Sequence, residues 1–362
     1  MMKGPINMAI NPPVDATKTP EWAALQKHYD ELQSEGISLK QWFADDAERV
    51  EKLSFDAGDL HFDLSKNLIK PETLQLFADL AKAVKLDERT KAMYTGVHIN
   101  NTEDRAVLHT ALRRPVEDEG KYIVDGQDTV KDVREVLDRI YAFADKVRSG
   151  EWTGVTGKKI ETVVNIGIGG SDLGPVMVYE ALKPYADAGI SARYISNIDP
   201  NDLAEKTKGL DPETTLFIIV SKTFTTLETL TNAREARTWL LEDSRPRRHR
   251  RFRRQERRSH QEALRRRLHQ PGEGRRVRHR PEQRVRLLEL GRRPLLRRFR
   301  RRHLPRRGLR PARFEEFLHG FHEIDEYFAN TPFEKNVVVL LGMLNVWYRN
   351  FFKVASHAVL PY

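Results

Sequence analysis

One glycine-rich stretch constrains the fold of this chain more tightly than any other feature. An apolar run at 162–166 leads into Gly167-Ile168-Gly169-Gly170, and an amphipathic segment then continues to Leu182. Short apolar runs are typical of buried parallel strands, and a glycine turn that opens a helix brings free backbone N–H groups to the positive end of the helix dipole. The pattern predicts a strand, a phosphate-binding turn and a helix, although a strand-to-helix turn without a ligand can have the same glycines.

The turn does not fit the dinucleotide-binding fingerprint. In G-x-G-x-x-G the third glycine would stand at Asp172, and an acidic side chain at that position repels a pyrophosphate. The pattern therefore resembles a phosphate-binding turn but not the dinucleotide-binding one.

A second candidate loop follows a later apolar run, at 216–220. The run opens into Ser221-Lys222-Thr223-Phe224-Thr225-Thr226, which holds four hydroxyls and one ammonium. At the carboxyl end of a parallel strand these groups can donate several hydrogen bonds to a phosphate. Thr225 and Glu228 also have the spacing of a helix capping box. Both interpretations stay open, because a capped helix start and a phosphate site use the same free N–H groups.

Strands and helices alternate through the middle of the chain. We expect strands at 162–166, 192–196 and 215–220, and helices at 173–182, 200–206 and 226–240. The alternation predicts an α/β fold with a doubly wound parallel sheet, in which both candidate loops lie at carboxyl ends of strands, where ligands bind. Apolar residues at helical spacing predict that the region before about residue 118 is helical.

Several long motifs occur in a recognisable order. They are Gly58-Asp59-Leu60 with Asp63-Leu64-Ser65-Lys66-Asn67, then 99–109, 166–175, 196–200, 221–229, Trp347-Tyr348-Arg349-Asn350 and 357–362. Together they resemble the glucose-6-phosphate isomerase family, aldose–ketose isomerases of glycolysis and gluconeogenesis that are built on sugar-isomerase (SIS) domains. The resemblance implies an N-terminal helical region at 1–118, a first sugar-isomerase domain at 119–313, and the truncated start of a second α/β domain at 314–362.

The resemblance also implies a substrate and a site. Members of the family interconvert glucose 6-phosphate and fructose 6-phosphate through a cis-enediol intermediate, and this chemistry needs no metal or nucleotide cofactor. Carried over by position, the residues that bind the substrate phosphate are Gly170 and Ser171 in the first loop and Ser221, Lys222, Thr223 and Thr226 in the second.

No catalytic residue carries over to this chain. The family's arginine in Gly-Gly-Arg-Tyr-Ser falls where this sequence has Arg293-Pro294-Leu295-Leu296, and its glutamate base, ring-opening histidine and lysine correspond to positions beyond Tyr362. We therefore expect the chain as written to be inactive. Family members form homodimers whose sites take groups from both subunits, and the sequence leaves open whether a chain that stops at Tyr362 does so.

The net charge of +10 comes from one block. Residues 245–310 hold 28 arginines, no lysine and five glutamates, so the rest of the chain carries a net charge of −13. Guanidinium groups at this density cannot be buried without partners. Three interpretations compete, namely an arginine-rich arm that binds nucleic acid, a solvated disordered insert, and a stretch of the gene read in the wrong frame over about 244–311.

The genetic code favours the third interpretation. When the last two bases of each codon are joined to the first base of the next, Arg-Arg (CGN-CGN) becomes GNC, which encodes Val, Ala, Asp or Gly. In the same way 287–297 can be re-read as Phe-Trp-Asn-Trp-Val-Gly-Gly-Arg-Tyr-Ser, which resembles the family's signature. We therefore expect a frameshifted block and no nucleic-acid partner.

Composition limits the remaining function classes. The chain has no cysteine, which excludes disulfides and thiolate metal sites, and it has no run of about 18 apolar residues that could span a membrane. We expect a cytoplasmic protein with a small sugar phosphate as its partner, no membrane partner and no metal. Two other classes stay open: a phosphosugar-binding module without catalysis, and an arginine-rich nucleic-acid-binding protein.

Overall fold

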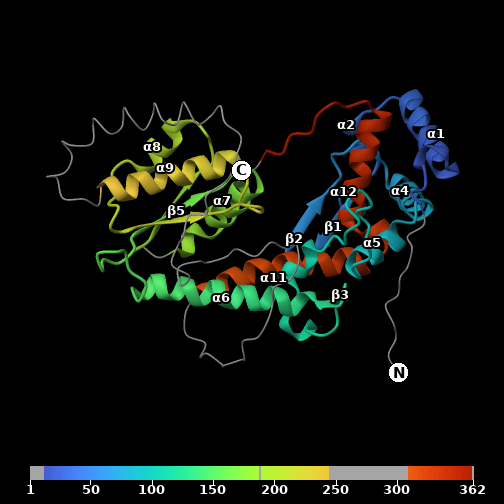
Figure 1. Cartoon of the computed structure of the whole chain (residues 1–362). Helices are drawn as coiled ribbons and strands as arrows, with labels where there is room; N and C mark the ends of the chain where they lie inside the picture. The colour runs from blue at the N-terminus through green and yellow to red at the C-terminus, as the bar shows by residue number, and fades with distance from the viewer. Residues whose placement is uncertain (1–11, 187–188, 244–308, 361–362) are drawn as a thin grey trace, which may run out of the picture. The chain divides into compact units, whose positions relative to one another are not determined.

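The computed structural model describes residues 12–186, 189–243 and 309–360 (Figure 1). The chain forms two compact units. The helical unit comprises Met1–Glu135 and Phe314–Tyr362, and the sheet unit comprises Val136–Arg313. The chain passes between the units inside helix α6 (Thr129–Ser149) and again inside helix α11 (Leu309–Asn330). Residues 244–308 of the arginine-rich block lie outside the described residues.

The helical unit begins with a well-capped helix. Thr19 accepts a hydrogen bond from the backbone N–H of Trp22, and Pro20 occupies the first helical position, where its missing N–H costs nothing. This helix is α1 (Pro20–Glu35). The other α-helices of the unit, besides parts of α6 and α11, are α2 (Leu39–Asp45), α3 (Arg49–Lys52), α4 (Pro71–Ala83), α5 (Leu86–Tyr94) and α12 (Val337–Val346). Helix α12 continues into a π-helical turn at Trp347–Phe351.

A hairpin that the sequence analysis does not predict interrupts the region before residue 118, whose other regular elements are helices. Strands β1 (Ser54–Ala57) and β2 (Leu60–Asp63) pair antiparallel around a two-residue turn. The turn contains Gly58 at φ +57°, a backbone conformation that favours glycine. A second, shorter hairpin joins β3 (Ile123–Val124) to β4 (Gln127–Asp128).

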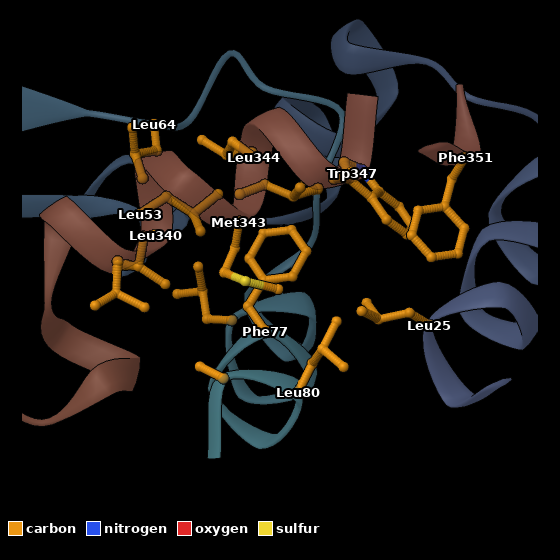
Figure 2. Close-up of a cluster of buried hydrophobic side chains, with 14 of the residues drawn as sticks. Leu25, Leu53, Leu64, Phe77, Leu80, Leu340, Met343, Leu344, Trp347 and Phe351 are labelled. Carbon is orange, nitrogen blue, oxygen red and sulfur yellow. The ribbon is translucent and has the colours of Figure 1, made fainter. Parts of the chain in front are cut away.

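The core of the helical unit joins segments from both ends of the sequence. Figure 2 shows Leu25 of α1, Phe77 and Leu80 of α4 and the apolar residues of α12 around one cluster. The indole of Trp347 is fully buried there, with Phe77 and Phe351 as ring neighbours. Residues 314–362 therefore pack with the N-terminal residues into one unit. The domain boundaries expected at 118 and 313 stay predictions.

The sheet unit contains a parallel three-stranded sheet in the order β6-β5-β7. Its strands are β5 (Thr162–Ile166), β6 (Ser191–Ile195) and β7 (Thr215–Ile219), so the three predicted strands are confirmed to within one residue at each end. Ile166 of the central strand is level with Ile195 on one side and Ile219 on the other. The carboxyl ends of all three strands therefore lie at the same edge of the sheet.

Helices cover this sheet. Helix α7 (Gly170–Leu182) packs on β5 and β6, α8 (Pro200–Thr207) on β6, and α9 (Leu227–Asp243) on β5 and β7. Val164 and Ile166 of the central strand form the buried core with Ala236 of α9. The predicted α/β class with a parallel sheet is confirmed.

Candidate functional site

The two candidate loops start side by side at one edge of the sheet. They follow β5 and β7, which are direct neighbours, and the backbone N–H of Val220 donates to the carbonyl of Ile166 at 2.8 Å. Loops that leave adjacent parallel strands at the same level can contact one ligand together. The sequence placed both loops at carboxyl ends of strands, and the pairing of β5 with β7 brings them together.

The first loop is a tight turn that opens α7. Gly169 has φ +59° and ψ −126°, a conformation that favours glycine, and it directly precedes the helix. The N–H of Ser171 donates to Ile168 O at 3.2 Å and that of Asp172 to Gly169 O at 3.0 Å. Within the described part of the chain, the N–H groups of Gly169 and Gly170 have no acceptor. These two donors, at the positive end of α7, are available to an anion.

The second loop is closed by the hydroxyl of Ser221. This residue is 7% exposed, and its Oγ accepts from the backbone N–H of Phe224 at 3.2 Å and lies 3.3 Å from Oγ1 of Thr226. Phe224 has φ +53°, so the loop bends sharply at a residue that has a side chain. The Ser221 hydroxyl thus has partners inside the loop before any ligand arrives.

Residues 222–225 of the second loop are exposed, and Lys222 and Thr223 are the two of them predicted to bind phosphate. Lys222 pairs with no carboxylate among the described residues. The hydroxyl of Thr223 lies 2.5 Å from that of Thr225, so these two hydroxyls share one hydrogen bond. Helix α9 begins at Leu227, which places Thr226 directly before the helix. The capping box expected between Thr225 and Glu228 stays a prediction.

The arrangement can hold a small anion. It offers one ammonium, several hydroxyls and two backbone N–H groups. The described residues contain no cluster of three or more His, Cys, Asp or Glu side chains with the geometry of a metal site. None of the described helices is both long enough and apolar enough to cross a membrane. Where the six predicted phosphate-binding residues would contact a ligand stays a prediction.

Sequence reasoning missed the residues that hold the loops in place. Asn165, 8% exposed in the middle of β5, donates from Nδ2 to the carbonyl of Ser171 at 3.1 Å. Asp202 accepts from the backbone N–H groups of Ser196 and Asn197 at 3.0 and 2.9 Å. A polar residue inside an otherwise apolar strand was the available signal for Asn165, because buried amides require partners.

A strand side chain also supports helix α7 farther along. The hydroxyl of Tyr194 in β6 lies 3.4 Å from the carbonyl oxygen of Pro175, and its ring packs against Tyr179. Burial raises the pKa of Tyr194 to about 12, so the phenol stays protonated and can donate at neutral pH.

Comparison with known proteins assigns the chain to a family. The model of the phosphoglucose isomerase family matches residues 63–253 and 310–362. The unmatched stretch between them lies inside the arginine-rich block. The chain is 77% identical to glucose-6-phosphate isomerase of Bifidobacterium longum and 48% identical to that of Mycobacterium tuberculosis, with 98% of this chain aligned in each case. It spans 63% and 62% of those relatives' lengths.

A solved structure agrees with this assignment. The crystal structure of a glucose-6-phosphate isomerase from Chlamydia trachomatis superposes with a TM-score of 0.53 at 26% identity, over 64% of this chain and 43% of the other. The resemblance noted in the sequence motifs is thereby confirmed at the level of the family. Since the family model covers more than half of the residues, the chain belongs to the phosphoglucose isomerase family.

Proposed function

We propose that this chain serves the interconversion of glucose 6-phosphate and fructose 6-phosphate, and that its own contribution is the binding of the sugar phosphate. The observation that carries the proposal is the pair of loops at the carboxyl ends of β5 and β7, level with each other and rich in phosphate donors. The model of the phosphoglucose isomerase family covers both loops, and relatives aligned over 98% of the chain are named glucose-6-phosphate isomerase.

In this proposal each loop supplies a different kind of donor. The first gives the backbone N–H groups of Gly169 and Gly170, with Ser171 beside them. In the second, Lys222 and Thr223 meet the phosphate directly, while Thr226 lies at the start of α9. Because Ser221 is engaged with Phe224 and Thr226, its hydroxyl serves first to shape the loop. A dianionic phosphate gains most from the lysine, since hydrogen bonds between charged groups are the strongest available here.

The chemistry of the reaction sets a further requirement. Isomerisation removes a proton from C2 of the open-chain aldose and returns it to C1, with no net oxidation, so it needs a base near these carbons and a cation for the developing enediolate. The resemblance assigns these groups to positions outside the present 362 residues or to the segment that contains Arg293. We therefore propose that residues 1–362 alone bind the sugar phosphate without turnover.

The proposal also covers two finer features of the fold. We infer that the sheet is doubly wound and that the sheet unit is the first sugar-isomerase domain. The strand order supports this inference, because the chain moves from β5 to β6 on one side and then to β7 on the other. Such a reversal marks the ligand-binding crevice of open α/β sheets. A cytoplasmic location is likewise proposed from the family alone.

Calorimetric titration of the purified chain tests the binding. Glucose 6-phosphate is expected to bind, glucose is not, and inorganic phosphate is expected to compete. Replacement Lys222→Gln should weaken the affinity about 10- to 100-fold, the range for losing a hydrogen bond between charged groups. Lys208→Gln is a matched control, because Lys208 is an exposed lysine of the same unit that pairs with Glu205.

Three outcomes would contradict the proposal in different ways. Equal affinity for glucose and glucose 6-phosphate would remove the phosphate as the recognised group. An equal loss in the Lys208 control would show that general surface charge, rather than the loop, holds the ligand. Conversion of fructose 6-phosphate by the 362-residue chain in a coupled spectrophotometric assay would overturn binding without turnover.

A further inference from the structure

We propose that Asn165 is a positioning residue for the first candidate loop, because its side chain supplies to the Ser171 carbonyl the hydrogen bond that Pro175 cannot. The inference rests on the proposed function in one respect, which is that the loop binds a phosphate. It extends that function by assigning the geometry of the loop to a buried residue of the central strand.

The proline leaves one helical carbonyl without its usual donor. In an α-helix the carbonyl of residue i accepts from the N–H of residue i+4, and for Ser171 in α7 that residue is Pro175, which has no N–H. Asn165 fills the gap from outside the helix, since its Nδ2 donates to Ser171 O at 3.1 Å. The strand therefore completes the hydrogen bonding of the helix.

A glycine makes this close approach possible. A Cβ atom at Gly167 would lie 2.5 Å from the carbonyl oxygen of Ser171 and 2.9 Å from its carbonyl carbon, distances that real side chains do not adopt. The Ser171 carbonyl is thus seated against the end of β5, between the amide of Asn165 and the bare backbone of Gly167. Three residues thus determine the surroundings of the Ser171 carbonyl oxygen. Asn165 donates a hydrogen bond to it, Gly167 leaves room for it, and Pro175 lacks the N–H that would otherwise bond to it.

The anchored carbonyl fixes the turn that carries the candidate donors. Ser171 is the second residue of α7, and its N–H is held by Ile168 O. The N–H groups of Gly169 and Gly170 belong to the same turn. Their direction therefore depends on where the Ser171 peptide is held, and Asn165 holds it. Preorganised donors bind an anion more tightly because less ordering is required on binding.

A purely structural reading is that Asn165 only satisfies its own buried amide. The two readings differ in how Asn165 and Pro175 depend on each other. If the carbonyl of Ser171 needs a donor, then Pro175→Ala restores the helical N–H and makes Asn165 dispensable. If Asn165 merely fills space in the strand, its replacement has the same effect with or without the proline. A double-mutant cycle separates the two.

The experiment combines Asn165→Leu, Pro175→Ala and the double variant with two measurements. Hydrogen exchange of the segment 167–173, followed by mass spectrometry or NMR, reports on the turn itself. Calorimetric titration with inorganic phosphate and with glucose 6-phosphate reports on binding. Asn165→Leu is expected to speed exchange in the segment and to weaken both ligands by about 10-fold, the effect of one lost hydrogen bond. In the Pro175→Ala background both effects should fall to less than about two-fold.

Two further variants keep the result interpretable. Thr162→Val is the matched control, because Thr162 is a buried polar residue of the same strand whose hydroxyl bonds to Ser191 at the opposite end. It should leave exchange in 167–173 unchanged. If Asn165→Leu does not fold, Asn165→Asp tests the same bond, because it keeps the size and replaces the donor by an acceptor.

Each outcome decides a separate point. Equal effects of Asn165→Leu in both backgrounds, or unchanged exchange in 167–173, would overturn the positioning role. A native chain that binds neither ligand, while exchange still shows coupling between positions 165 and 175, would overturn the proposed function and support the anchoring of the turn by Asn165.

Discussion

At the residue scale, His98 joins two segments through two carboxylates. Its Nδ1 lies 2.9 Å from Asp104, and its Nε2 lies 3.1 Å from Asp125. Both aspartates have positive φ angles, which directs their side chains to the ring from sharp turns. Only the imidazolium can donate from both nitrogens, so hydrogen bonds to Asp104 and then to Asp125 raise the pKa of His98.

This raised pKa predicts how stability changes with pH. A group whose pKa is higher in the folded state stabilises the protein fully below its unfolded pKa, near 6.5, and this contribution is lost as pH rises through the folded pKa. Because the ring is partly exposed, we expect no more than about 1 kcal/mol. Urea unfolding of the native chain and of His98→Gln should differ below pH 6.5 and converge in mild alkali.

A second histidine provides the control for this experiment. Burial of His28 lowers its pKa, so its contribution to stability is lost as pH falls, the opposite direction. His98→Gln should leave that acid-side loss unchanged. A constant difference between the two chains across the pH range would show that the His98 contacts do not depend on its charge.

At the element scale, the loop at 65–69 is held by side chains instead of by a sheet or helix. The buried guanidinium of Arg49 donates to the carbonyls of Ser65, Asn67 and Ile69 at 2.9 to 3.1 Å. Burial lowers the pKa of Arg49, but an arginine stays charged at any physiological pH. One arginine therefore replaces the backbone partners that the loop lacks.

Side chains of the π-helical turn at Trp347–Phe351 also form hydrogen bonds with the loop at 65–69, although the two segments are far apart in the sequence. The indole Nε1 of Trp347 donates to Leu68 O at 3.0 Å, and the hydroxyl of Tyr348 accepts from the N–H of Leu68 at 2.8 Å. Burial raises the pKa of Tyr348, so this hydroxyl stays neutral. The two aromatic residues thus satisfy both backbone groups of Leu68.

Tyr348→Phe should therefore destabilise the helical unit by about 1 to 3 kcal/mol, because it leaves the N–H of Leu68 without an acceptor. Chemical unfolding monitored by the buried Trp347 measures the change. Tyr185→Phe is a useful comparison, since the Tyr185 side chain is exposed and its hydroxyl makes no hydrogen bond among the described residues, so this change should cost less. Equal losses in the two variants would contradict the role given to burial.

Elements with a strong local signal could be predicted from the sequence. The strands of the sheet follow from short apolar runs, and the glycine turn before α7 follows from Gly169. The role of Asn165 could not be predicted, because it depends on a carbonyl six residues away that a proline leaves open. The β1–β2 hairpin was missed because Gly58-Asp59 was interpreted as a family motif and not as a turn.

At the scale of the whole molecule, the helical unit is built from two segments that are far apart in the sequence. Residues 314–362 share a core with the first 135 residues through Trp347 and its neighbours. No local sequence pattern predicts this packing, because the whole sheet unit separates the two segments of the helical unit in the sequence. Sequence alone therefore placed 314–362 in a part of its own, while the packed unit depends on contacts across more than two hundred residues.

The arginine-rich block conflicts with the rest of the molecule, and this conflict supports a final prediction. In the described part of the sheet, β7 is an edge strand with the apolar sequence Thr-Leu-Phe-Ile-Ile, and such edges promote aggregation unless they are covered. The family model passes over 254–309, the stretch that would follow α9. We propose that this part of the gene has been read out of frame.

Sequencing of the DNA from codon 240 to codon 315 should then reveal compensating single-base changes near the two ends of the block. Peptide mass spectrometry of the native protein should find Trp-Val-Gly-Gly-Arg in place of the arginine runs. The isoelectric point should fall from about 9.6 to below neutrality, because Arg-Arg steps become small residues while the remaining chain carries −13. A confirmed reading with all 28 arginines would instead make salt-dependent nucleic-acid binding the property to measure, since clustered guanidinium groups bind phosphates without regard to sequence.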